Sequence, residues 1–164
     1  MYATLETYTS LYGEITETEF NRFGLEADRV MDMYTTGIDN VKKLKIAFPA
    51  AEDSNIQACA CAIINVLKQI SDVETSQASA RGYTEGINGL QGKVVSSQSA
   101  GNESVSYGTA ERDLTAIDKA VGDTQQRNKL IMDIVKHWLS GITDANGVNL
   151  FYMGPYPVEV SSVS

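Results

Sequence analysis

The stretch that decides the fold of this chain is Ile56-Gln57-Ala58-Cys59-Ala60-Cys61-Ala62-Ile63-Ile64-Asn65-Val66-Leu67-Lys68-Gln69-Ile70. Its apolar residues recur at three- and four-residue steps, which is the spacing of one wide apolar face on a helix. Many of them are alanines, whose small side chains allow another helix to pack closely. We therefore predict a helix over residues 50–74, bounded by Pro49, and expect it to be the central helix of the core.

A second helix is predicted before it, over residues 16–36. It opens with Thr16-Glu17-Thr18-Glu19, a capping box in which the Thr16 hydroxyl accepts from a backbone N–H and Glu19 bonds back to the cap. The apolar stripe that follows consists of Phe20, Phe23, Ala27, Val30, Met31 and Tyr34. Gly37 is expected to end this helix as a left-handed cap. Further upstream, residues 7–13 read as a short turn of helix that ends at a glycine.

Two more helices are predicted in the second half of the chain, over residues 110–120 and 123–140. Gly122 separates them, and Asp123 and Thr124 are both suitable N-caps for the second. That last helix carries an apolar stripe formed by Leu130, Ile131, Ile134, Val135, Trp138 and Leu139. Gly141 is expected to stop it. The pattern predicts an all-α fold, a small helical bundle within a single domain of 164 residues.

The segment between the core helices is different in kind, since it is rich in glycine and serine and poor in charge. Within it, Val94-Val95-Ser96-Ser97 and Ser104-Val105-Ser106-Tyr107 resemble strands, and residues 98–102 have the composition of a turn. We predict an arm over residues 92–108, either a β-hairpin or a pair of extended segments. An isolated hairpin is marginal in water, so the arm needs helices or another subunit to pack against.

The carboxyl segment, residues 142–164, is punctuated by glycine and proline and is predicted to be an extended tail. It contains Leu150-Phe151-Tyr152-Met153-Gly154-Pro155-Tyr156, which is unusually apolar for a terminal segment. Such a segment is expected to dock on its own domain or on a neighbour.

The net charge of −8 excludes the basic footprint that nucleic-acid binders need. The one basic cluster, formed by Lys42, Lys43 and Lys45, reads as a solvated turn. The amino-terminal residues lack the features of a signal peptide, and no apolar run approaches the roughly 20 residues that span a bilayer. We therefore expect no membrane, and a protein made in a cytoplasm or carried from there inside an assembly.

No combination of residues indicates catalysis or a cofactor. Cys59 and Cys61 are expected to be buried apolar residues, and His137 is a lone histidine on a helix. The carboxylate pairs Glu17 with Glu19 and Asp28 with Asp32 read as solvated surface rather than an acid–base dyad. The run Asp144-Ala145-Asn146-Gly147 reads as a turn, because it lacks the further ligands of a calcium loop. Phosphate-binding glycine loops are absent. We expect a protein that is not an enzyme and binds no metal.

Several of these segments resemble the head–tail connector, or adaptor, proteins of tailed bacteriophages that infect Gram-positive bacteria. The similarity lies in residues 2–13, Glu17-Thr18-Glu19-Phe20, residues 27–37, Gln57-Ala58-Cys59-Ala60, and above all residues 95–107. The last of these is similar to a Ser/Gly-rich segment of that family. Trp138-Leu139 followed by residues 147–154 is similar to the family's carboxyl end, although Met153 stands where a basic residue is usual.

This resemblance implies a structural virion protein of the phage neck, a mostly helical subunit that forms a homo-oligomeric ring, typically a dodecamer. The ring lies beneath the portal protein, extends the DNA channel and helps to retain packaged DNA, which passes without sequence-specific binding. It also presents a docking surface for a stopper or tail-completion protein. No catalysis and no cofactor are implied, and the expected location is the virion, with the host cytoplasm during assembly.

We hypothesise that partners bind at the arm and at the tail. The arm would contact a neighbouring subunit or the adjacent ring, and the tail would dock on the portal. The residues expected to make these contacts are Val94, Val95, Val105, Tyr107, Leu150, Phe151, Tyr152, Met153 and Tyr156. The alternatives are another neck protein, such as a stopper or tail-completion subunit, or a small helical cytoplasmic enzyme or regulator that uses His137. Stopper and tail-completion proteins tend to be β-rich, which the helical stripes argue against.

Overall fold

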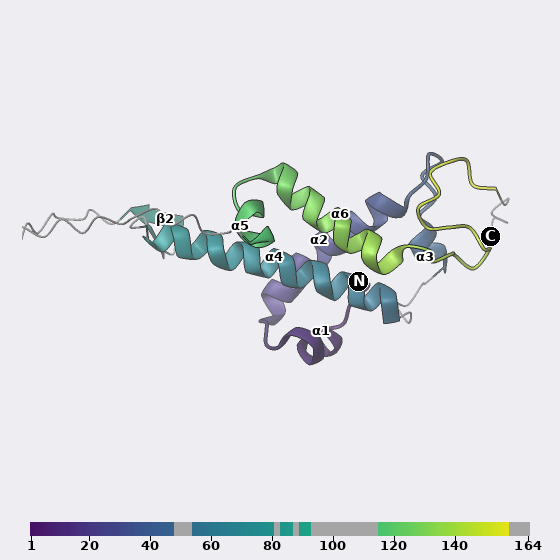
Figure 1. The fold of residues 1–164 in the computed structure, drawn as a ribbon. Coiled ribbons are helices and arrows are strands. Elements are labelled where there is room, and N and C mark those ends of the chain that lie inside the picture. The colour runs from purple at the N-terminus through teal and green to yellow at the C-terminus, as the bar shows by residue number, and fades with distance from the viewer. Residues whose placement is uncertain (48–53, 81–82, 87–88, 93–114, 158–164) are drawn as a thin grey trace, which may run out of the picture.

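The computed structural model describes residues 1–47, 54–80, 83–86, 89–92 and 115–157. It contains the helices α1 (Leu5–Tyr12), α2 (Glu17–Thr35), α3 (Lys43–Ala47), α4 (Ser54–Ala80), α5 (Ala116–Ala120) and α6 (Thr124–Leu139). A short hairpin of β1 (Tyr83–Gly86) and β2 (Gly89–Gly92) follows α4. The chain is mostly helical, which confirms the predicted all-α class (Figure 1).

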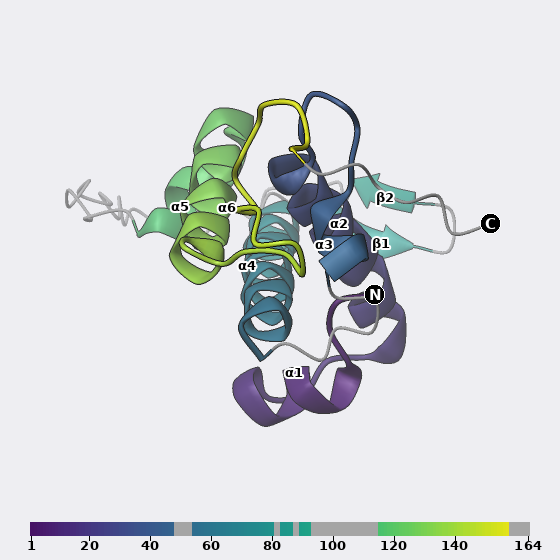
Figure 2. The same ribbon diagram turned by 90° about the vertical axis from the view of Figure 1, so that its right-hand side faces the viewer.

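α4 is the central helix, as the apolar stretch around it predicted. It packs against α2 on one side and α6 on the other, and Figure 2 shows it between the two. Its whole predicted apolar face is buried: Ile56, Cys59, Ala60, Ile63, Ile64, Leu67 and Ile70. The facing stripe of α2 is buried as well, except that Tyr34 is partly exposed. The core therefore forms where three amphipathic helices bring their apolar faces together.

The start of α2 is capped as predicted, but its end is not. At the start, Thr16 and Glu19 form the predicted capping box, with reciprocal side-chain to backbone hydrogen bonds. At the end, the predicted left-handed cap at Gly37 is wrong, because the helix stops at Thr35 and Thr36 is already extended. Gly37 has another role: a Cβ there would lie 3.2 Å from the carbonyl oxygen of Gly154. The glycine lets the carboxyl segment approach closely.

α4 is longer at its carboxyl end than the predicted range of 50–74, since it continues to Ala80. Beyond Ile70 none of its described side chains is buried, so this end leaves the bundle (Figure 1). Apolar periodicity could not predict that extension, because these residues have no core to face. The helix then leads into the hairpin, in which Tyr83 pairs with Gly92 and Gly86 with Gly89. This hairpin was not predicted; the predicted strands at 94–97 and 104–107 lie outside the described residues.

The last two helices, α5 and α6, each begin at a side-chain N-cap. The predicted helix 110–120 is shorter than expected, because Thr115 is an extended N-cap that forms a capping box with Asp118, so α5 begins at Ala116. Residues 110–114 lie outside the described part of the chain. Gly122 interrupts the chain with a positive φ, and Asp123 caps α6 as predicted. Gly141, also at positive φ, follows the end of α6 at Leu139.

By length and composition alone, the stretch Ser54–Ala78 of α4 would suffice to cross a membrane, contrary to the expectation from apolar runs. Half of its most apolar window is buried inside the protein, and core helices of soluble proteins pass the same test. The apolar face of α4 is accounted for by its packing against α2 and α6.

Candidate functional site

The residues predicted to bind partners fall into three groups in the structure. Val94, Val95, Val105 and Tyr107 lie outside the described residues. Leu150 is a core residue with 0% of its surface exposed, so it has no surface to offer a partner and its predicted role is wrong. Phe151 and Tyr156 are partly exposed, while Tyr152 and Met153 are exposed. We define the tail loop as residues 142–157. The candidate site is therefore the exposed part of this loop.

Lys43 holds the tail loop to α3. Its side chain is 1% exposed and its ammonium group donates to the backbone carbonyl of Asn149, at 3.4 Å, and to that of Tyr152. Burial lowers the pKa of Lys43, while the nearby carboxylate of Asp144 acts in the opposite direction. The reading of Lys43 as part of a solvated turn is wrong, because a distant segment of the chain covers it.

Asp144 organises the other side of the tail loop. The carboxylate is buried and accepts hydrogen bonds from the backbone N–H groups of Asn146 and Val148, both at 2.9 Å. This geometry confirms the predicted turn, with Gly147 at positive φ. The hydroxyl of Tyr156 donates to the same carboxylate. Burial, together with this contact to Asp144, raises the pKa of Tyr156. The loop is thereby closed on itself.

The tail loop also contacts the segment after α2. The backbone N–H of Ile38 donates to the carbonyl of Met153 at 3.2 Å, and that of Tyr156 donates to the Asp39 carboxylate at 2.7 Å. These bonds place the exposed side chains of Ile38, Tyr152 and Met153 on one part of the surface. The tail is therefore fixed to its own domain through its backbone, while several of its apolar side chains still face outward.

Met153 also lines an open, mainly apolar groove of about 430 Å³. It lies between α2, α6 and the tail loop, and its lining residues are Tyr34, Met132, Val135, Lys136, Ser140, Phe151 and Met153. Methionine and aromatic side chains adapt to different apolar partners. A groove of this composition suits an apolar peptide segment better than a charged small molecule.

A second polar network joins the amino terminus to α2. The Tyr2 backbone N–H donates to Asp28 at 2.9 Å, and its hydroxyl donates to Asp32 at 2.6 Å. Asp32 also lies 3.5 Å from the ammonium group of Lys42 and 3.6 Å from that of Lys45. Burial and the hydrogen bond to Asp32 raise the pKa of the Tyr2 hydroxyl. Asp28 and Asp32 are thus partly buried structural partners, and the reading of this pair as solvated surface is wrong.

The remaining reactive side chains do not converge. Cys59 and Cys61 are buried free thiols, as predicted, and burial raises their pKa to about 12 and about 11. Thiols held protonated in this way are poor nucleophiles. His137 is exposed, and its ring contacts that of Trp138 edge to face. Within the described residues no group of histidine, cysteine and acidic side chains is arranged to hold a metal ion.

Comparisons of the chain with protein-family models, with curated proteins and with solved structures found no match.

Proposed function

We propose that this chain is a structural subunit of a phage neck, a head–tail connector that assembles into a ring beneath the portal protein. The ring would extend the DNA channel and offer a docking surface to a stopper or tail-completion protein. The resemblance of residues 95–107 and of the carboxyl end to connector proteins is the reason for proposing this family. The fold supplies a helical bundle with segments suited to assembly.

The observation that carries this proposal is the projecting end of α4. Roughly the last ten residues of the helix, about 15 Å of its length, extend beyond the last buried residue, Ile70. This end of the helix, which has no buried side chain between Ser71 and Ala78, leads into the hairpin of β1 and β2, and together they form an arm (Figure 1). An exposed helix end and a two-stranded hairpin are each marginal alone. They are readily explained if a neighbouring subunit covers them.

The tail loop supports a second contact in the same proposal. Met153 is exposed and lines the groove between α2, α6 and the tail loop, and Ile38 and Tyr152 are exposed on the segments bonded to it, which makes this region a suitable place for the portal to dock. Single exposed apolar side chains are common, but a cluster next to an apolar groove is typical of a protein interface. The tail's backbone is already fixed, so docking there would cost little ordering entropy.

The charge of the chain fits a subunit that lines a DNA channel without binding the duplex. With a net charge of −8, the subunit repels phosphate on average, which favours passage over retention. A ring of such subunits would multiply this effect.

The proposal is tested by expressing the full chain alone and together with the portal protein encoded in the same genome. We expect co-purification with the portal and closed rings in negative-stain electron microscopy. Substitution of Met153 and Tyr152 by serine should weaken portal binding, whereas Lys129→Ser on the exposed side of α6 should not. A wild-type chain that does not bind the portal protein when the two are expressed together would contradict the proposal. A discrete small species whose activity depends on His137 would favour the enzyme alternative.

A further inference from the structure

The first element of the inference is an acidic and partly apolar surface at the amino-terminal end of α2. Residues 1–20 contain four glutamates and no lysine or arginine. Glu14 and Glu17 are exposed and form no ion pair with any residue that the structure describes. Beside them Leu11 is 54% exposed and Tyr12 is exposed as well. We call these four residues, Leu11, Tyr12, Glu14 and Glu17, the acidic face.

The second element is a basic and partly apolar surface toward the other end of α2. Leu25, Arg29 and Met33 follow one another at four-residue steps, so they share one side of the helix. Leu25 is 68% exposed and Met33 is 59% exposed, and Arg29 between them is exposed too. No described ion pair uses Arg29.

The lysines before and within α3 extend this surface. Arg29, Met33 and Lys42 line one shallow hollow of about 420 Å³. Lys45 is exposed, and both lysines lie near the same carboxylate, that of Asp32. Asp32 lines the same hollow and pairs with the two lysines, while Arg29 has no described ion pair, so this surface carries more positive than negative charge although the chain as a whole is acidic. We call Leu25, Arg29, Met33, Lys42 and Lys45 the basic face.

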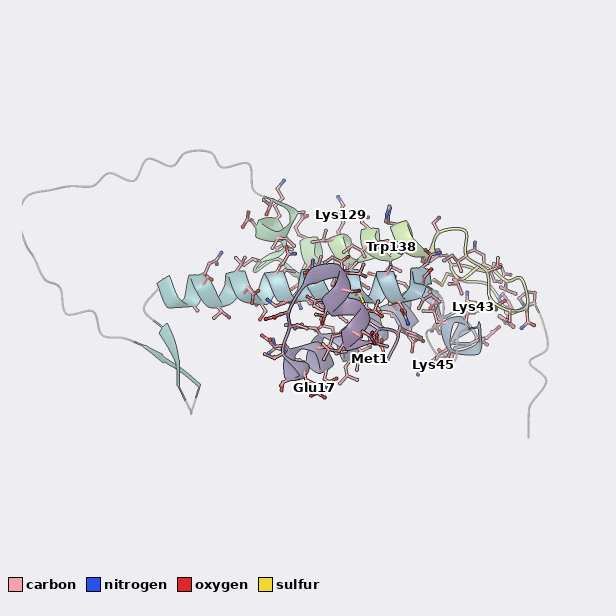
Figure 3. The ribbon with its side chains drawn as sticks, turned by 90° about the horizontal axis from the view of Figure 1, so that it is seen from below. Met1, Glu17, Lys43, Lys45, Lys129 and Trp138 are labelled. Carbon is pink, nitrogen blue, oxygen red and sulfur yellow. The ribbon has the colours of Figure 1, made fainter. Side chains whose placement is uncertain are left out.

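The charged groups of the two faces lie apart within one molecule, since Arg29 is about 18 Å further along α2 than Glu17. α2 has 19 residues and is about 28 Å long, and the acidic face lies at its start while Met33, Lys42 and Lys45 lie at its end. Figure 3 shows Glu17 beside α1 and Lys45 toward α3. The acidic face thus exposes two large apolar side chains and two glutamates without an ion pair to any described residue, although Lys68 lines a hollow with Glu14. The basic face exposes two large apolar side chains, Arg29 without a described ion pair, and two lysines that share the Asp32 carboxylate.

We propose that the basic face of one subunit binds the acidic face of a second copy of this chain. Leu25 and Met33 would cover Leu11 and Tyr12, while Arg29 and the two lysines would face Glu14 and Glu17. Because the contact joins two different surfaces, it is heterologous and repeats from subunit to subunit, closing into a ring when the rotation allows. The inference rests on the proposed function, since it identifies the surfaces by which the subunits of that ring associate.

A second copy fits these surfaces better than a nucleic acid. Phosphate contacts require clustered basic groups, whereas here Arg29 stands between two exposed apolar side chains that a phosphate backbone would leave in water. The acidic face would take no part in binding nucleic acid. Interfaces between proteins, in contrast, combine a central apolar area with a charged rim.

The experiment uses two charge-reversed forms of the full chain. One carries Arg29→Glu with Lys45→Glu on the basic face, and the other carries Glu14→Lys with Glu17→Lys on the acidic face. We expect the wild-type chain to self-associate more weakly as salt rises, and each variant alone to lose at least about tenfold in association by sedimentation equilibrium. An equimolar mixture of the two variants should recover it, because every acidic surface again meets a basic one.

The matched control is Lys129→Glu on α6, which lies on the other side of the molecule from α1 (Figure 3). It should associate like the wild type, and circular dichroism should show all four forms equally helical. A wild-type chain that stays monomeric, a variant that still assembles alone, or a mixture that fails to recover would each overturn the inference. So would binding of a DNA duplex that is lost in the basic-face variant without any change in self-association.

These outcomes are separable from the proposed function. Rings that form and bind portal despite both charge reversals would refute the two faces and leave the connector role standing. If the mixture of variants regains self-association but the chain does not bind the portal, the result would support the contact between the two faces and count against the connector role.

Discussion

The tail loop and the projecting end of α4 both lie at the edge of the helical bundle, but only the tail loop is anchored to the core. The tail loop, residues 142–157, has little secondary structure but is held by Leu150 in the core, by Lys43 on its backbone and by the Asp144 turn. Residues 71–80 of α4 are helical and have no buried side chain among those described. Regular hydrogen bonding and anchorage to the core are therefore separate properties, and the second decides which segment is stable on its own.

The largest effect should come from Leu150→Ala, which removes the tail loop's anchor from the core. A fully buried leucine truncated to alanine costs about 2–5 kcal/mol, because transfer free energy is lost and a cavity remains. Urea unfolding measures this change. The matched control is Met153→Ala, three residues away and 48% exposed, which should change stability by less than about 0.5 kcal/mol. Equal losses in the two variants would show that the tail is not anchored as described.

Lys43→Met should have the next largest effect, since it keeps the buried stem but removes the donor to two tail carbonyls. The Asn149 carbonyl still accepts the backbone N–H of Tyr152 at 2.9 Å, so the loss falls mainly on the Tyr152 carbonyl. Leaving one such acceptor unpaired costs about 1–3 kcal/mol, offset in part by no longer burying a charge. We expect lower stability and faster amide exchange in the tail loop, with α6 unchanged. Lys45→Met, whose ammonium group is exposed, is the control and should cost at most about 1 kcal/mol. Unchanged exchange in the tail of the Lys43 variant would contradict the role of this contact.

Tyr156→Phe should have a smaller effect that depends on pH. At neutral pH the lost hydrogen bond to Asp144 is worth about 0.5–1.5 kcal/mol. Because the folded protein raises the pKa of this hydroxyl, the stabilisation is complete below the ordinary tyrosine value of 10.0 and is lost as pH rises through the folded value. Thermal unfolding of both forms from pH 7 to pH 11 should show the difference between them shrinking above pH 10. A constant difference would exclude this contribution from Tyr156.

The smallest effect is expected in the projecting end of α4, where Val73→Ala should change the stability of the isolated subunit by less than about 0.5 kcal/mol. Alanine favours a helix more than valine does, and valine here is only partly buried. Ile64→Ala, in the part of the same helix that forms the core, is the contrast and should cost about 2–5 kcal/mol. A large loss at Val73 would mean that this end packs within the subunit rather than awaiting a partner.

The local patterns of the chain predicted much of the fold. The stripes in α2, α4 and α6, the Thr16–Glu19 capping box and the Asp123 cap are all confirmed, because each depends on residues within one or two turns. The ends of α4 and α5 were less predictable. Between Ser71 and Ala78 no buried side chain marks α4, and the Thr115 side chain caps the start of α5.

The candidate site was only partly predictable. The apolar tail was recognised as a docking segment, but the sequence left open whether it would meet its own domain or a neighbour. Leu150 is buried and Met153 is exposed, and nothing in the local pattern of the tail distinguishes these two apolar residues. Nothing in the sequence around Lys43 distinguishes it from Lys42 and Lys45, so its burial could not be predicted locally. The alternation of exposed Leu25, Arg29 and Met33 is visible in the sequence, but it acquires meaning only beside Lys42 and Lys45.

By itself, then, the sequence determined where the long helices α2, α4 and α6 lie, which face of each is apolar and how α2 and α6 begin, since these are interactions among near neighbours in the chain. The tertiary structure alone decided the partners of Asp28, Asp32 and Lys43, the inward direction of Leu150 and the separation of acidic and basic faces along α2. Those features depend on segments up to 109 residues apart meeting in space. No local energy term specifies such a meeting, which results from burying all the apolar faces at once.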